Sequence, residues 1–170
     1  MLSHISFGEG HKSLAILVPT KDFDKESIRT HYVLPLVAKG IKEEEIIAFN
    51  LGHNDKGKAP VTTIIKPWIE NLEKVLLTLN IKHVLSASGD YFKTICKERK
   101  ADPHYGYQKQ TIWPGMVGYL TVNYKALMFN PAMQKKIDLS LAATAQGILG
   151  GPGLFSKKAL EECYLPETLS

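Results

Sequence analysis

The chain has 170 residues, 44% of them hydrophobic and 22% charged, which is typical of a single folded domain. This composition excludes an intrinsically disordered chain, a collagen and a coiled coil. The 21 Lys and Arg residues exceed the 17 Asp and Glu residues, and the formal charge of +4 is compatible with nucleic acid without indicating it.

Short apolar runs and scattered metal-binding residue types limit the class of protein further. The run Leu14 to Val18 is far shorter than the roughly 18 to 20 residues that span a bilayer. The N-terminus lacks a secretory signal pattern, so we expect a cytoplasmic protein without a membrane span. Cys96, Cys163 and six scattered histidines lack the spacing of metal sites, and no metal or cofactor is predicted.

The first third of the chain alternates strand and helix patterns. Residues 13–18 form a continuous apolar run, which predicts a strand buried on both faces of a parallel sheet. Asp24 is placed to cap a helix that ends at Gly40 and is kinked or shortened at Pro35. A second apolar run at 46–51 predicts another strand, followed by a glycine-rich loop.

The middle of the chain repeats this order. A 3.6-residue apolar period over 61–79 predicts a long helix, whose regular part is expected to begin at Pro67. Residues 82–87 predict a buried strand, and Asp90 is expected to open a short helix through Lys97.

The last third begins with an aromatic and glycine-rich stretch, 101–118, which we interpret as a functional loop. Residues 120–124 and 126–129 are expected to form strands, and Pro131 to start a helix that a glycine-rich stretch ends near 150. We therefore expect one domain over residues 1–150, and a tail or linker to a following domain over 151–170.

Repeated strand and helix patterns predict an α/β fold with a mainly parallel central sheet and helices on both faces. Ligands of such sheets bind beyond the carboxyl ends of the strands. The segments expected at that edge are 19–24, 50–58, 86–90 and 129–131.

Four polar side chains in those segments are candidate site residues. Asn50 could read the paired edge of a base, Asp22 or Asp24 could orient a water as general base, and Asn130 could hold a water or a base. The structural alternatives are a strand-ending turn for Asn50, helix capping for Asp24, simple solvation for Asp22 and a helix-starting turn for Asn130.

Cations near tyrosines and a tryptophan suggest a second kind of site, a surface for single-stranded nucleic acid. The alternative is a solvated helix face beside core aromatics. The candidate DNA-binding residues are Lys58, Lys93, Lys97, Arg99, Lys100 and Lys109. Motifs of serine hydrolases, P-loop NTPases and dinucleotide enzymes do not occur.

Two segments resemble the uracil-DNA glycosylase fold. Residues 65–95 resemble its middle, a long helix, a buried strand and a Gly/Ser turn into a helix, and 125–146 resemble its late segment with an Asn-Pro loop. The likeness extends in element order over about residues 13–148. It implies a three-layer sandwich of the uracil-DNA-glycosylase type.

Four stretches, 15–41, 46–58, 90–107 and 128–142, are similar to the N-terminal domain of family A DNA polymerases of tailed bacteriophages. This resemblance implies a glycosylase-like domain that precedes exonuclease and polymerase domains. The parent chain would then be a DNA-directed DNA polymerase in the cytoplasm of the host cell. The implied partners are DNA, those downstream domains and other replication proteins.

Carried over residue by residue, the resemblance implies a degenerate active site. Of the glycosylases' water-activating segment, only Pro19 and a shifted Asp22 or Asp24 are present. Asn50 matches their uracil-reading Asn, and Asn130 with Pro131 matches their late loop. We therefore expect a noncatalytic accessory domain that contacts DNA or replication partners. The alternatives are residual base excision and a pure protein-docking domain.

Overall fold

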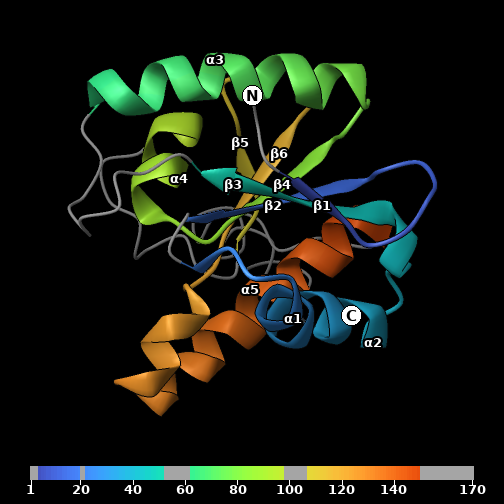
Figure 1. Cartoon of the computed structure of the whole chain (residues 1–170), viewed down its shortest axis with the longest axis vertical. Helices are drawn as coiled ribbons and strands as arrows, with labels where there is room; N and C mark the ends of the chain where they lie inside the picture. Colours follow the sequence, from blue (N-terminus) through green and yellow to red (C-terminus); the bar gives the residue numbers. More distant parts are fainter. Residues whose placement is uncertain (1–3, 20–21, 52–61, 98–106, 150–170) are drawn as a thin grey trace, which may run out of the picture.

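A computed structural model describes residues 4–19, 22–51, 62–97 and 107–149, without the side chains of 62–65 and 90. Over these residues the chain is an α/β fold in which a six-stranded sheet has helices on both faces (Figure 1). The expected tail, 151–170, lies outside the described residues, as does most of the loop expected after the second strand.

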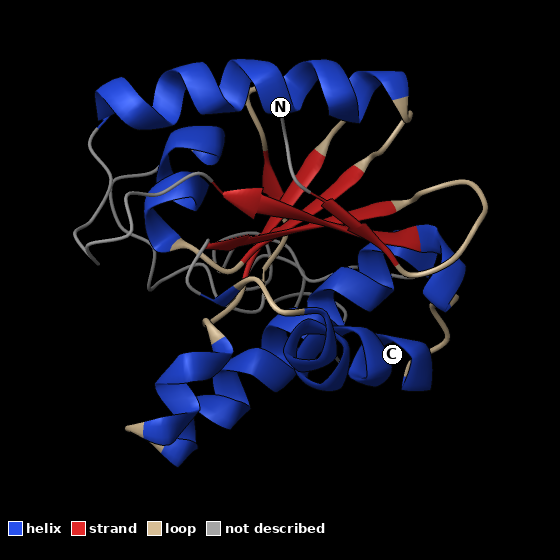
Figure 2. Ribbon diagram, viewed as in Figure 1, coloured by secondary structure: helices blue, strands red, loops and turns tan. Residues whose placement is uncertain are grey.

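The sheet has the strand order β1-β3-β2-β4-β6-β5. Its strands are β1 (His4–Ser6), β2 (Leu14–Pro19), β3 (Ile46–Leu51), β4 (His83–Ser86), β5 (Lys109–Gln110) and β6 (Val117–Leu120). The four central strands are parallel, as expected, whereas β1 and β5 pair antiparallel at the two edges. The sheet is therefore mixed, and only its centre matches the parallel prediction (Figure 2).

The helices divide between the two faces of the sheet (Figure 1). One face carries α1 (Lys25–Ile28), η2 (Arg29–Val33), α2 (Leu34–Ala38) and α5 (Gln134–Leu149), and the other carries α3 (Thr62–Thr78) and α4 (Gly89–Cys96). Short 3₁₀ turns are η3 (Glu43–Glu45), η5 (Tyr124–Met128) and η6 (Pro131–Met133). Within the described ranges, no helix combines the length and apolarity needed to cross a membrane.

Strand β2 lies in the middle of the sheet, between β3 and β4, and all six of its residues are buried. Its side chains alternate between two hydrophobic cores. Ile16 and Val18 pack toward α1 and α5, whereas Ala15 and Leu17 pack toward α3 and α4. The continuous apolar run thus marks a strand covered on both faces, as predicted.

The first helical segment is continuous but changes its winding. Asp24 caps α1 as predicted, and its carboxylate accepts hydrogen bonds from the Ser27 N–H at 3.0 Å and hydroxyl at 2.8 Å. The next turn is a π-helix in which the Leu34 N–H donates to the Arg29 carbonyl, five residues back. Pro35, which has no N–H to donate, follows directly at the start of α2, so the predicted irregularity occurs as a wider turn.

Two helix starts differ from the prediction. Helix α3 begins at Thr62 and contains Pro67 in its second turn. Pro67 is exposed, so the carbonyl that loses its partner lies on the water-facing side of the helix. Helix α4 is capped by Ser88, whose hydroxyl accepts from the Tyr91 N–H at 3.4 Å, instead of opening at Asp90.

Three further expectations are wrong in the outer parts of the sheet, and one strand was missed. Residues 120–124 and 126–129 were expected to form strands. Strand β6 instead ends at Leu120, and 126–129 lie in and after the 3₁₀ turn η5, which Asn123 caps. The stretch 101–118 was expected to be a loop, but it contains β5 and the start of β6. The edge strand β1 is not predicted from the sequence, because three residues are too few to display a strand period.

Gly147 in α5 gives a direct test of the packing between this helix and the sheet. A Cβ at this position would lie 1.9 Å from the Tyr119 hydroxyl, which is itself 3.0 Å from Nδ1 of His83. We predict that Gly147→Ala lowers the free energy of unfolding by about 1–3 kcal/mol through overpacking. Urea unfolding followed by circular dichroism measures this change.

The neighbouring Gln146→Ala is the matched control, since Gln146 is exposed on the same turn. It should leave the free energy of unfolding within about 0.5 kcal/mol of wild type. In Gly147→Ala, helix propensity alone would stabilise the protein, because Ala is a better helix former than Gly by about 1 kcal/mol. A stabilised Gly147→Ala variant would therefore show that Tyr119 does not approach α5 as described.

Candidate functional site at the carboxyl edge of the sheet

The carboxyl ends of the four parallel strands lie at one edge of the sheet, on the left in Figure 1. The segments that follow β2 and β6 meet at this edge. Although β4 lies between these strands in the sheet, side chains from the two segments are hydrogen-bonded to each other. This contact defines the candidate site.

Asp22 is the centre of the contact. Its carboxylate accepts a hydrogen bond from the Asn123 side-chain amide, and its main-chain carbonyl accepts from the Tyr124 hydroxyl at 2.7 Å. Burial raises the pKa of the Tyr124 hydroxyl, so it remains a donor at neutral pH. The two segments are thus joined through both the side chain and the backbone of Asp22.

Tyr32 joins the π-turn η2 to the same segment. Its buried hydroxyl donates to the Val122 carbonyl at 2.7 Å and accepts from the Tyr124 N–H at 2.8 Å. The His31 ring is stacked on Tyr124, with ring centroids 5.0 Å apart and an interplanar angle of 1°. Burial lowers the pKa of His31, which favours the neutral imidazole.

The structure places Asp24 and Asn130 in capping positions. Hydrogen bonds from the Ser27 N–H and hydroxyl lower the pKa of Asp24 and keep its carboxylate ionised. The Asn130 side chain accepts from the Ala132 N–H at 3.1 Å at the start of η6. Both residues therefore have the structural roles that the sequence left open as alternatives.

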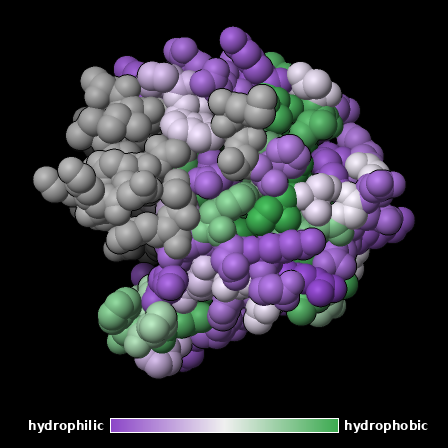
Figure 3. Space-filling model, viewed as in Figure 1, coloured by the Kyte–Doolittle hydropathy of each residue, from purple (hydrophilic) through white to green (hydrophobic). Residues whose placement is uncertain are grey.

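Asn130 also lies apart from the sheet. Turns η5 and η6 extend beyond the sheet at the lower left of Figure 1, and the neighbouring Met128 and Phe129 are 75% and 87% exposed. Figure 3 shows apolar surface at the same end of the molecule. Asn50, by contrast, is a half-buried residue of β3 that pairs with Val18 of β2. Asn50 is thus part of the sheet itself, whereas Asn130 belongs to a turn beyond it.

The candidate DNA-binding lysines that the structure describes lie on or at the end of α4 and on β5, apart from this site. Lys97 ends α4 in the left-handed conformation, with φ 53°, and Lys109 lies in the edge strand β5. A Cβ on Gly118 would lie 2.8 Å from Cys96 Sγ and 3.8 Å from the Lys109 carbonyl, so the end of α4 is beside β5.

Helix α4 runs back from the carboxyl edge, so Lys97 at its end lies away from Asp22, and Lys93 lies one turn earlier in the same helix. These lysines are therefore not part of the carboxyl edge at which the candidate catalytic residues were expected. The other predicted cations, Lys58, Arg99 and Lys100, lie outside the described residues.

The predicted site residues did not include His31, Tyr32, Asn123 and Tyr124. Asn123 and Tyr124 lie in the segment that follows β6, which ends at Leu120, so the rule that selected Asn50 could have selected them. They were instead assigned to strand. The ring of Tyr32 is buried in the hydrophobic core, whereas its hydroxyl makes the bonds that hold the site.

The chain matches no protein-family model and no curated protein sequence. Within the described residues, no three His, Cys, Asp or Glu side chains are grouped so that they could hold a metal ion.

Tyr32→Phe tests the importance of this contact. Removing the hydroxyl breaks its hydrogen bonds to the Val122 carbonyl and the Tyr124 N–H. This loss should lower the free energy of unfolding by about 1–3 kcal/mol. Urea unfolding would measure the loss. Tyr107→Phe, at a half-buried tyrosine near β5, is the control and should change little. Equal stability of Tyr32→Phe and wild type would contradict the bridging role.

Proposed function

We propose that this chain is a noncatalytic, uracil-DNA-glycosylase-like three-layer domain that precedes the exonuclease and polymerase domains of a bacteriophage family A DNA polymerase. Its role would be to contact DNA or replication partners. The order of elements supports this proposal. The segment 65–95, which resembles the middle of the glycosylases, contains most of α3, then β4, the Ser88 turn and α4. The segment 125–146, which resembles their late part, contains η6 and most of α5.

The state of the two carboxylates after β2 carries the noncatalytic part of the proposal. Glycosidic cleavage needs a flipped base in a tight pocket and a water or carboxylate facing the sugar. Asp24 is used as a helix cap, and Asp22 is bonded to Asn123. Both carboxylates therefore accept hydrogen bonds from the fold itself, which supports a noncatalytic role.

The lysines on α4 and β5 support the proposed contact with DNA. Phosphate contacts require cations on an accessible surface and do not require a catalytic pocket. Lys97 is exposed at the end of α4, and Lys109 is half-buried on the adjacent edge strand. We therefore propose that DNA is held along α4 and the edge strand β5, and not at the carboxyl edge around Asp22.

Binding to single- and double-stranded DNA at several salt concentrations tests this role. Lys97→Asn and Lys109→Gln should each weaken binding across all sequences and reduce the slope of log K against log salt by about 0.9 per lost phosphate contact with duplex. Asn is chosen at position 97 because it tolerates the left-handed conformation.

Lys39→Gln is the matched control, since Lys39 is exposed at the end of α2 on the opposite face of the sheet. It should leave both the affinity and the slope unchanged. Binding without any salt dependence, or an equal loss in Lys39→Gln, would argue against DNA contact at this edge.

Residual base excision is tested separately. Asn50, placed near the end of β3, is the feature that favours this alternative activity. We predict that the protein releases no uracil from single- or double-stranded DNA, so that alkali treatment reveals no abasic sites while an active glycosylase control does. Abasic sites that disappear in Asn50→Ala would instead establish the protein as a glycosylase.

A further inference from the structure

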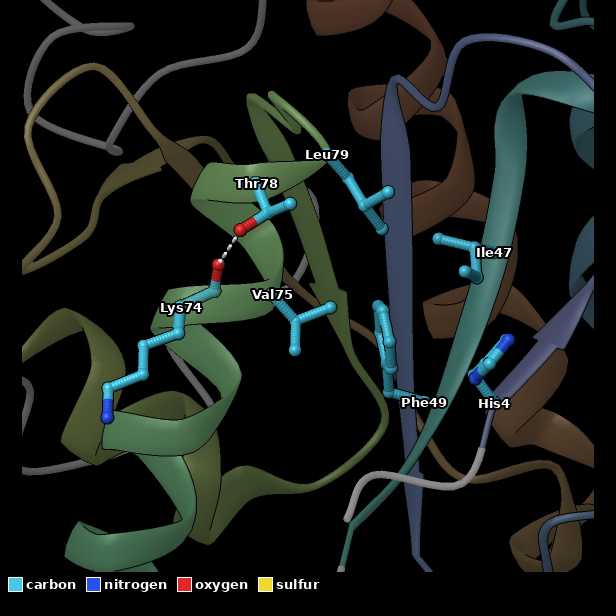
Figure 4. Close-up of a pocket in the computed structure, with 7 residues that line it drawn as sticks. All are labelled: His4, Ile47, Phe49, Lys74, Val75, Thr78 and Leu79. Atoms are coloured by element: carbon cyan, nitrogen blue, oxygen red, sulfur yellow. Dashed lines mark hydrogen bonds between the residues drawn. The ribbon is translucent and has the colours of Figure 1, made fainter.

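Strand β1, which lies at the edge of the sheet that the described residues form, is beside an apolar cavity of about 350 Å³ (Figure 4). Ile47 and Phe49 of β3 form its floor, and Val75 of α3 and Leu79, which follows α3, form its opposite wall. His4 of β1 lines the outer side, with its ring centroid 6.2 Å from that of Phe49. The Lys74 amine points away from the cavity, so the lining is almost wholly apolar (Figure 4).

The register of β1 shows which of its main-chain groups face outward. The Phe7 N–H donates to the Ile46 carbonyl, so this opposed pair is a hydrogen-bonded pair of the antiparallel ladder. Because such pairs alternate along the ladder, the N–H and C=O groups of His4 and Ser6 point away from β3. Among the described residues, none bonds to these outward groups.

The same two residues project their side chains toward the cavity side of the sheet. His4 pairs with Phe49 and Ser6 pairs with Ile47, and both β3 residues belong to the core beneath α3. A strand added outside β1 would have its own alternate side chains on that face. One of those side chains, opposite His4, would enter the cavity from its open side.

We propose that β1 and this cavity form a docking site for an extended segment of a partner protein, which adds a strand to the sheet and buries one large apolar side chain, such as Leu, Ile or Phe. Main-chain hydrogen bonds to His4 and Ser6 supply affinity, and the cavity supplies specificity. This inference goes beyond the proposed DNA contact and does not depend on it, since the site lies at the opposite edge of the sheet from β5.

A partner protein suits this site better than a second copy of the chain. If two β1 strands paired antiparallel through their outward groups, Ser6 of the second copy would lie opposite His4. Its small polar side chain would leave an apolar cavity of this size unfilled. The cavity therefore favours a segment with a larger apolar residue at that place.

A phage-displayed library of linear twelve-residue peptides is the probe for this site. We expect selected sequences to share one large apolar residue within an extended, β-prone pattern. In the complex, the His4 and Ser6 amides should become protected from hydrogen exchange, because they point toward the added strand. Selection of no peptide, or protection at other strands only, would overturn the proposal.

Two pairs of variants locate the binding. Ser6→Pro removes the outward N–H without breaking a β1–β3 bond and should weaken peptide binding about tenfold, whereas Ser6→Ala should not. Val75→Trp fills the cavity and should abolish binding, whereas Leu77→Trp adds the same ring on the exposed side of α3.

Circular dichroism and urea unfolding confirm that each variant is folded. Equal peptide binding by wild type, Ser6→Pro and Val75→Trp would refute the site. A concentration-dependent dimer in light scattering that Ser6→Pro abolishes would assign this edge to a second copy instead. Salt-dependent DNA binding would be unaffected by these variants, so the proposed function fails or succeeds separately.

Discussion

Burial of β2 on both faces is the constraint on which the rest of the structure depends. A fully apolar strand excludes water only when it lies between other strands and beneath helices on both sides, and β3 and β4 with the two helical layers supply that cover. Parallel pairing with both neighbours follows from the helical connections after β2 and β3. The carboxyl ends of three strands are thereby fixed at one edge.

At that edge, side chains that the sequence suggested as catalytic candidates make structural hydrogen bonds. Asp22 and Asn123 are 101 residues apart in the sequence and are hydrogen-bonded in the fold. With Tyr32 and Tyr124 they form a polar network across the ends of β2 and β6. Such networks specify one arrangement of the elements, because the fold is destabilised when a buried polar group loses its hydrogen-bond partner. The network therefore holds the segments after β2 and β6 in one relative position.

The extent of successful prediction follows the physics of each element. Apolar runs at 13–18 and 46–51 predicted β2 and β3, because two-sided burial leaves an unbroken apolar signal, and 82–87 was also correctly predicted as the buried strand β4. The apolar run ending at Phe129 misled the prediction, since its last residues are exposed to solvent. Local capping by Asp24 was predictable from three neighbouring residues. The bonds of Asp22 to the segment after β6 were not, because no local pattern records a partner so distant in sequence.

The brevity of the edge strands has a consequence for the lifetime of any assembly that uses them. Strand β1 has three residues and β5 has two, so each can form only a few intermolecular bonds. Short edges of this kind oppose the open-ended stacking that leads to fibres. They also make release fast, since residence time is set mainly by how many contacts must break together. A sheet terminated in this way favours brief, exchangeable encounters over permanent complexes.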